Sequence, residues 1–182
     1  MVDVVFTTAT DIESEFDDAV KDSEFIVEAK VDRSNEATGV ELLNKKRSQI
    51  IAAMSEKLGS NLLKRTRAMY WSADRSLRIA CTISKRYENG PGYWYAFHPK
   101  WQSFLGDADN SFLVLGCIGR DDAFAIPLDH LVENLEYLNT TGEGEKIYWH
   151  IHLNEMRNGD IYLVIPKREN ISLMDYQLRL RG

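Results

Sequence analysis

Cationic and aromatic residues are interleaved through one third of this chain, from Asn44 to Lys100. This third holds twelve basic and three acidic residues, a local charge of +9 in a chain whose net charge is −6. It also holds two of the four tryptophans, Trp71 and Trp94, and a third, Trp101, follows it directly. Since cations bind phosphates and aromatic rings stack on unpaired bases, this composition predicts binding of a nucleic acid.

The residues expected to make these contacts fall into two groups. The predicted phosphate contacts are Lys45, Lys46, Arg47, Lys64, Arg65, Arg67, Arg78 and Arg86. The predicted stacking residues are Trp71, Trp94 and Trp101, and tryptophans on adjacent strands could enclose one base or methylated group in an aromatic pocket. Two alternatives stay open: the aromatic residues fill the core, or the basic third is the docking site of an acidic N-terminal arm.

A second group of residues that could do chemistry is the pair His150 and His152. Residues two apart on a strand point to the same face, so both imidazoles could hold a metal ion, with Glu155 or His98 as a third ligand. The alternating residues Trp149 and Ile151 belong to an apolar face, which places the histidines on the exposed side. Ordinary surface histidines or contacts to a ligand without metal are the alternatives, and the sequence assigns no cofactor.

A divalent-metal nuclease is the alternative enzyme. Such a site needs an aspartate in one strand and an acidic residue two positions before a lysine in the next. Asp74 stands in a suitable hairpin and Glu41 could contribute, but Ile83 occupies the position two before Lys85. The missing carboxylate weakens this reading, because Mg²⁺ requires hard oxygen ligands. No phosphate-loop or nucleophile-elbow motif is present either.

The two cysteines, Cys81 and Cys117, lie in apolar runs typical of buried strands. Free cysteine packs as a small hydrophobic residue, so we expect two reduced, buried thiols. Without a CxxC pair, the sequence has no zinc signature.

The elements that must position these residues begin with a helix. A capping box at Thr38 to Glu41 and apolar residues at spacings of three and four predict a helix over about 39–58, ended by Gly59. Three strands with tight turns follow over residues 67–101, and their alternation is typical of antiparallel sheet. Tyr93, Tyr95 and Phe97 share one face of the third strand, so this strand is either buried on both sides or has one binding face.

The second half of the chain continues with alternating strands and one further helix. Strands are expected at residues 112–118, 123–126, 147–153 and 161–165, with a helix after Pro127 and an edge strand or docking tail over 173–180. The order predicts an α+β fold: a mainly antiparallel curved sheet of about six to eight strands, with one long N-terminal helix and one later helix packed on it.

Charge divides the chain into an arm and a body. Residues 1–41 contain twelve acidic and three basic residues, and we expect residues 1–37 to form an acidic arm attached to a single α+β domain over 38–182. The absence of a signal-like N-terminus and of an 18-residue apolar run favours a cytoplasmic protein without membrane contact. The sequence therefore predicts a non-catalytic nucleic-acid-binding module, within a larger DNA-processing or defence system. The alternatives are the nuclease and a protein–protein module that acts through its acidic arm.

Overall fold

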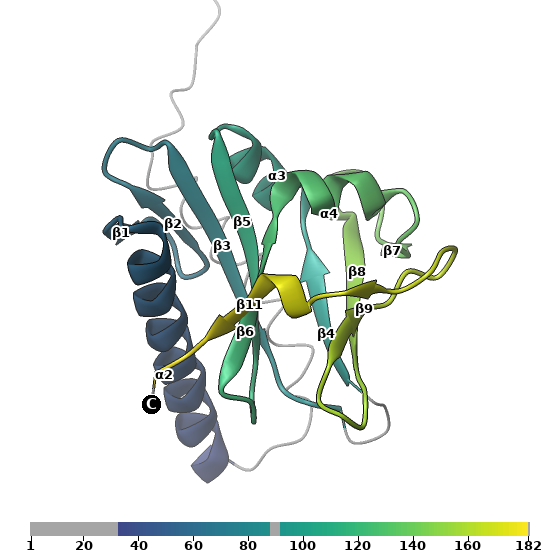
Figure 1. The fold of residues 1–182 in the computed structure, drawn as a ribbon, viewed down its shortest axis with the longest axis horizontal. Helices are drawn as coiled ribbons and strands as arrows, with labels where there is room; N and C mark the ends of the chain where they lie inside the picture. Colours follow the sequence, from purple (N-terminus) through teal and green to yellow (C-terminus); the bar gives the residue numbers. More distant parts are fainter. Residues whose placement is uncertain (1–32, 88–91, 182) are drawn as a thin grey trace, which may run out of the picture.

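Two β-sheets, one long helix and two short helices make up the part of the chain that the computed structural model describes, residues 33–87 and 92–181 (Figure 1). The α-helices are α2 (Arg33–Leu58), α3 (Pro99–Gly106) and α4 (Leu128–Leu135). Single turns of 3-10 helix lie at Gly144–Lys146 and Met174–Tyr176. The predicted acidic arm lies outside the described residues up to position 32, and its last five positions belong to α2.

Sheet A has six strands and is mixed. Its strands are β1 (Leu62–Lys64), β2 (Met69–Ser72), β3 (Leu77–Ser84), β5 (Asn110–Cys117), β6 (Asp122–Pro127) and β11 (Gln177–Arg179). They lie in the order β1-β2-β3-β5-β6-β11, and only the pair β3 and β5 is parallel. Helix α2 covers one face of this sheet (Figure 1).

Sheet B has five strands and is antiparallel. Its strands are β4 (Gly92–Phe97), β7 (Thr140–Thr141), β8 (Tyr148–Glu155), β9 (Ile161–Leu163) and β10 (Ile171–Ser172). They follow the order β10-β9-β8-β4, with β7 paired to β8. In the pair β4–β8, Tyr95 stands opposite Ile151.

The single curved sheet predicted from the sequence is wrong, because the third strand of the expected meander leaves the sheet. A parallel pair cannot be joined by a tight turn and needs a long crossover connection. Here the connection from β3 to its parallel neighbour β5 passes through β4 and α3, and β4 pairs with β8 in the second sheet. The structure is α+β with two sheets and three α-helices in the described residues.

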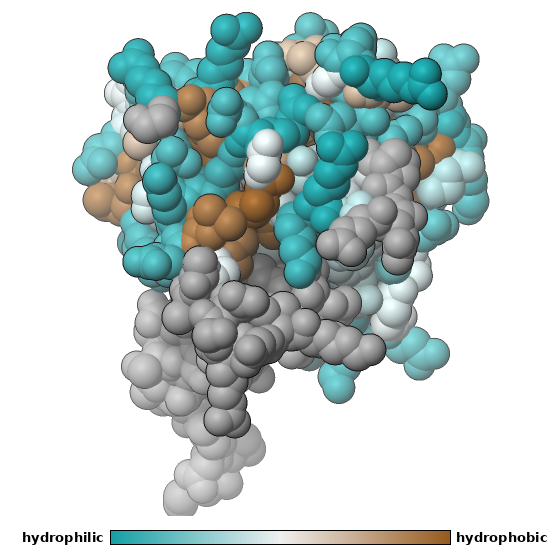
Figure 2. All heavy atoms as spheres, turned by 90° about the horizontal axis from the view of Figure 1, so that it is seen from below, coloured by the Kyte–Doolittle hydropathy of each residue, from teal (hydrophilic) through white to brown (hydrophobic). Residues whose placement is uncertain are grey.

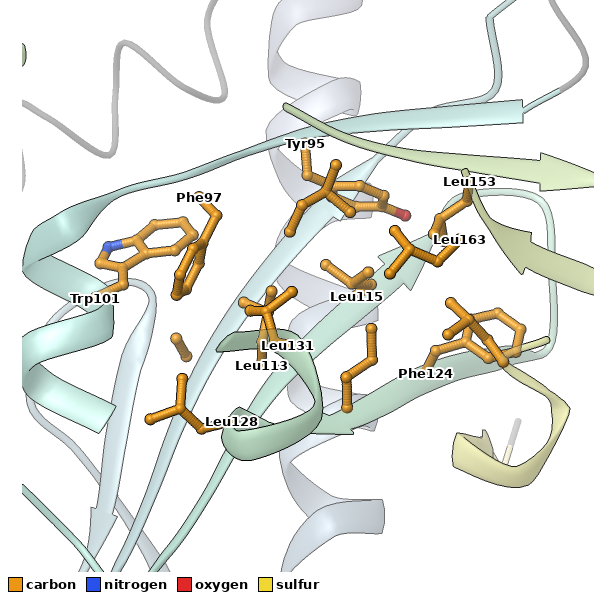
Figure 3. Close-up of a cluster of buried hydrophobic side chains, with 14 of the residues drawn as sticks. Tyr95, Phe97, Trp101, Leu113, Leu115, Phe124, Leu128, Leu131, Leu153 and Leu163 are labelled. Atoms are coloured by element: carbon orange, nitrogen blue, oxygen red, sulfur yellow. The ribbon is translucent and has the colours of Figure 1, made fainter. Parts of the chain in front are cut away.

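The main core lies between the two sheets and beneath α3 and α4 (Figure 3). Tyr95 and Phe97 reach it from β4, Leu113 and Leu115 from β5, and Trp101 from α3. The face of β4 that carries Tyr95 and Phe97 is therefore buried in the core. The opposite face carries Trp94, which is half-buried.

A second, smaller core lies between α2 and the opposite face of sheet A. Ile50 and Met54 of the helix pack with Ile79 and Val114 of the sheet. The spacing of four between these helical residues is the pattern that predicted the helix. Gly59 ends the helix with a φ of 61°, a left-handed conformation that glycine adopts without strain.

None of the helices in the described residues is long and apolar enough to cross a membrane.

Candidate functional site

Three arginines gather around one tryptophan at the end of sheet A where β3 begins. Trp71 of β2 stands opposite Arg78 of β3 in the sheet register. The guanidinium carbon lies 4.6 Å from the Trp71 ring centroid for Arg65, 4.7 Å for Arg75 and 5.9 Å for Arg78. Phe104 of α3 packs against the same indole at 6.2 Å between centroids. We call these five residues the Trp71 cluster.

The arginines of the Trp71 cluster have different surroundings. Arg78 donates to the backbone oxygen of Phe104 at 2.8 Å and forms an ion pair with Asp107 at 2.9 Å, and only 12% of its side chain is exposed. Arg65 and Arg75 are exposed. Arg78 therefore joins β3 to α3, whereas the other two guanidinium groups can reach a ligand.

The hairpin between β2 and β3 holds Arg75 in an unusual conformation. Its φ of 62° lies in the left-handed region, and Arg75 is the one residue other than glycine with a positive φ among the described residues. Asp74 stabilises the turn by accepting from the hydroxyls of Ser72 and Ser76 and from the Ser76 backbone. These hydrogen bonds, that of Ser72 first, lower the pKa of Asp74.

Two of the predicted phosphate contacts are buried under α2. Lys46 is 6% exposed and Arg47 is 4% exposed. Arg47 occupies the helical stripe that packs on the sheet, and Lys46 donates to the backbone oxygens of Arg120 and Asp122. Burial of both side chains argues against their predicted contact with phosphate. Lys45 is exposed beside them.

The predicted basic face is divided between two ends of sheet A. Arg78 pairs with Ser111 at the start of β5, whereas Arg120, the partner of Lys46, follows the end of that strand. Lys64 and Arg65 lie at the first end and are exposed, and Arg67 is half-buried. The basic residues therefore do not form a single continuous surface.

The three predicted tryptophans occupy three environments and form no common pocket. Trp71 lies in sheet A and Trp94 in sheet B. Trp101 is 2% exposed and packs edge-on against Phe97, which argues against its predicted stacking on a base. Burial of the largest apolar side chains contributes most to the core, which explains its place there.

Trp94 belongs to a row of rings on the outer face of sheet B. Tyr148 and His150 are nearly parallel, with centroids 5.3 Å apart and an interplanar angle of 13°, and His152 continues the row at 6.1 Å and 23°. Trp94 stands edge-on to His150 at 77°. Arg86, in the segment before β4, forms an ion pair with Glu155 at 3.0 Å. We call Trp94, Tyr148, His150 and His152 the ring row.

Hydrogen bonds fix the protonation of His150. The indole Nε1–H of Trp94 donates to Nδ1 at 3.3 Å, and Nε2 lies 2.7 Å from the Thr141 hydroxyl. Because an indole can only donate, Nδ1 carries no proton and Nε2–H donates to Thr141. Burial lowers the pKa of His150, and burial followed by the neighbouring imidazole lowers that of His152. Both rings are neutral near pH 7.

The histidines do not gather with other ligands into a metal site. Both nitrogens of His150 are already hydrogen-bonded, and Glu155 is bound by Arg120 at 2.6 Å and by Arg86. His98 packs against the rings of Trp101 and Tyr148. Across the described residues, no three histidine, cysteine, aspartate or glutamate side chains are placed to hold one ion.

The residues considered for a nuclease are not brought together as such a site requires. The Asp74 carboxylate is engaged in its own hairpin, and Ile83 packs in the core beneath α2. Glu41 is exposed on α2. Cys81 and Cys117 are buried as predicted, and burial raises the pKa of the Cys117 thiol to about 12, which leaves it protonated and unreactive.

One polar network was not predicted from the sequence. Arg120 binds both carboxylate oxygens of Asp122 at 2.7 Å and Glu155 at 2.6 Å, and Gln177 donates to Asp122 at 2.7 Å. It links the turn between β5 and β6 to β8 and β11. In the sequence, Asp121 and Asp122 follow a glycine and an arginine in a segment typical of a turn, and only the adjacent arginine indicates a bidentate pair.

Two clefts flank this turn, each of about 500 Å³. One of about 480 Å³ lies between α2 and the turn, lined by Leu42, Lys45 and Arg120, and one of about 510 Å³ lies between the turn and β11. Figure 2 views this end of the molecule, where apolar residues are exposed among a hydrophilic majority. The buried charges beside these clefts are paired with one another. They therefore stabilise the fold and are not available to bind a ligand.

In comparisons with models of protein families, with curated proteins and with solved structures, the chain matches none of them.

Proposed function

We propose that this chain binds nucleic acid without catalysing a reaction on it, and that the Trp71 cluster holds the phosphates. The observation that supports this most is the gathering of three guanidinium groups within 5.9 Å of one indole centroid, with Asp107 as the only carboxylate bonded to any of them in the described residues. Each of these groups carries a positive charge, so an anion that binds beside them is stabilised by electrostatic attraction.

The stacked geometry suits phosphate recognition. A guanidinium that lies over an aromatic ring keeps its N–H groups in the plane of the guanidinium, at the rim of the contact, where phosphate oxygens can accept them. Arg65 and Arg75 are exposed, and their guanidinium carbons lie over Trp71 at 4.6 and 4.7 Å from the ring centroid. The indole thus orders two flexible side chains before a ligand arrives, which lowers the entropy cost of binding.

The backbone of Arg75 is consistent with a functional role. An L-residue in the left-handed region costs about 1–2 kcal/mol, and glycine or asparagine would occupy it more cheaply. Strained residues of this kind concentrate at functional sites. The residue with this φ of 62° also holds its guanidinium over Trp71, which supports a role for the strained conformation.

A salt-dependent binding assay tests the proposal. We expect a fluorescence-anisotropy titration with labelled oligonucleotides to show binding that weakens steeply between about 50 and 200 mM salt. The double variant Arg65→Ala/Arg75→Ala should bind about tenfold more weakly, with the salt slope reduced by about two.

The matched control changes charge equally at a distance. Lys167 and Arg179 are exposed, and Arg179 lies on β11, at the opposite edge of sheet A from β1 and β2. Lys167→Ala/Arg179→Ala should leave binding unchanged to within a factor of two or so, since distant surface charges are screened. Equal losses in the two double variants, or no binding at low salt, would refute the proposal.

A further inference from the structure

The outer face of sheet B carries rings where an exposed sheet face normally carries polar chains. Trp94, Tyr148, His150 and Tyr162 are half-buried on this face, and His152 is exposed. Their neighbours on the strands, such as Ile151, point into the core. Among the described residues, no helix covers this face, so the rings are not accounted for by core packing.

The rings are held in fixed orientations before any ligand binds. Trp94, His150 and Thr141 form a chain of hydrogen bonds, and the near-parallel stacking of Tyr148 on His150 continues it. The row ends at His152, which stands opposite Trp94 in the register of β4 and β8. Preorganised flat surfaces bind planar ligands with little loss of side-chain entropy.

A basic segment lies near the His152 end of the row. The backbone of Trp94 donates to the Ser84 hydroxyl at 3.4 Å, and that of Tyr87 donates to the Gly92 oxygen at 3.1 Å. The segment between these contacts, which contains Lys85 and Arg86, therefore runs along the edge of β4 away from β8.

The two ends of the row differ in charge. Lys85 is exposed near the His152 end, whereas Arg86 is paired with Glu155, which shares the inward face of β8 with Ile151 and Leu153. At the Tyr148 end, the loop after β7 carries Glu143 and Glu145 with one lysine, Lys146. Phosphates are therefore favoured beside His152 and disfavoured at the far end.

We infer that the ring row binds unpaired bases, so that single-stranded nucleic acid is the preferred ligand of this chain. The inference rests on the proposed function and adds the substrate class. In a duplex the flat faces of the bases are stacked on one another and cannot reach a sheet surface, whereas in a single strand they are accessible. Bases lie on the ring row, and the backbone runs past Lys85 at the edge of β4.

The test compares ligands that differ only in their bases. Labelled 12-nucleotide DNA and RNA strands, the same DNA strand with its central bases removed, and the matching duplex are titrated with the full chain. We expect the intact strands to bind about tenfold more tightly than the abasic strand or the duplex, which corresponds to stacking of one or two bases.

Variants at His152 separate stacking from charge and from folding. Since His152 is exposed, His152→Ala should leave the fold intact, weaken single-strand binding about fivefold and leave duplex binding unchanged. His152→Phe keeps a ring and should restore single-strand binding. His130→Ala, a change to an exposed histidine of α4, is the control and should have no effect.

The outcomes distinguish this inference from the proposed function. Salt-dependent binding that is equal for strand, abasic strand and duplex, and unaffected by His152→Ala, would overturn the ring row and leave the Trp71 cluster standing. Single-strand binding that depends on His152 but not on Arg65 and Arg75 would support the ring row and overturn the Trp71 cluster. Absence of binding to every oligonucleotide would overturn both.

Discussion

Lys46 of α2 donates a hydrogen bond from its buried ammonium group to the backbone oxygen of Arg120, 74 positions along the chain. It donates a second one to the backbone oxygen of Asp122 at 3.1 Å. These acceptors flank the turn between β5 and β6, so one side chain ties the long helix to sheet A. Burial, as the largest effect, lowers the pKa of Lys46, which shows that the tie is made at a cost in desolvation.

Lys46→Met should destabilise the protein. The methionine fills a similar volume but leaves two buried carbonyl oxygens without their charged donor, which costs about 1.5–3 kcal/mol. Urea unfolding followed by circular dichroism measures the change. The adjacent exposed residue gives the control, since Lys45→Met should alter the free energy of unfolding by less than about 0.5 kcal/mol. Equal unfolding midpoints for the two variants would show that the Lys46 bonds contribute nothing.

Asp122 should make stability depend on acid pH. Burial alone would raise the pKa of this carboxyl, but the hydrogen bonds from Arg120 and Gln177 outweigh it, and the pKa is lowered from 3.8. A carboxyl with a lowered folded pKa stabilises the native state above its unfolded pKa, and this contribution is lost as pH falls through the folded value. We therefore expect the free energy of unfolding to fall as pH is lowered below about 4.

Asp122→Asn tests this origin of the acid sensitivity. The variant should be less stable at pH 7, because the Arg120 guanidinium loses a charged partner, and its stability should change less steeply between pH 5 and 2 than that of the wild type. Parallel pH profiles of the two proteins would assign the acid sensitivity to other carboxylates.

His150 should produce a second pH dependence, at milder acidity. Burial lowers its pKa from 6.5, and its Nδ1 accepts from Trp94, so protonation in the folded state breaks that bond. Between the folded and unfolded pKa values the unfolded chain binds more protons, and stability falls as pH is lowered through 6.5. Urea unfolding at pH 7.5 and 5.5 should show a decrease that is smaller in His150→Asn. His130→Asn, on the exposed surface of α4, should retain the full decrease.

Arg75→Gly should separate stability from binding. Glycine relieves the left-handed strain at φ 62°, so we expect the free energy of unfolding to rise by about 0.5–1 kcal/mol. Removal of the guanidinium over Trp71 should at the same time weaken nucleic-acid binding about threefold, through loss of one phosphate contact. Arg75→Ala, which keeps the strain, should lose binding without gaining stability. A gain in stability with unchanged affinity would exclude Arg75 from the binding site.

The sequence was most informative where one periodicity decided the structure. The stripe of residues that contains Ile50 and Met54 predicted a helix face, and those residues are buried against sheet A. The same stripe contains Arg47, which is buried with them. Arg47 was included among the predicted phosphate contacts because it is charged, although its position in the stripe indicated that it lies in the interior. Spacing was a better guide to the location of this side chain than residue type.

Strand pairing could not be predicted, and it determines the candidate site. Trp71 and Trp94 are both on strands of the predicted meander, and nothing local indicates that β4 pairs with β8, about sixty positions along the chain, instead of with β3. Because of that pairing, Trp94 contacts His150 of sheet B. Trp71 remains in sheet A, where it contacts the arginines near its own hairpin. Phe104 and Tyr148 were not predicted as site residues. The separation of the predicted residues into two surfaces depends on contacts between distant segments.

Residues 1–32 should weaken nucleic-acid binding through their charge. This segment lies outside the described residues and holds ten acidic and two basic residues, so its charge opposes that of a polyanion. Its deletion leaves α2 complete from Arg33 and should raise affinity for single strands a few-fold at about 50 mM salt, with a smaller gain at about 200 mM because salt screens the repulsion.

A full-length variant with the ten acidic residues changed to Asn or Gln separates charge from bulk, and it should reproduce the gain. If deletion raises affinity and neutralisation does not, the segment obstructs the surface sterically. If neither changes affinity, the acidic segment does not compete for the Trp71 cluster, and a basic protein partner becomes its more plausible ligand.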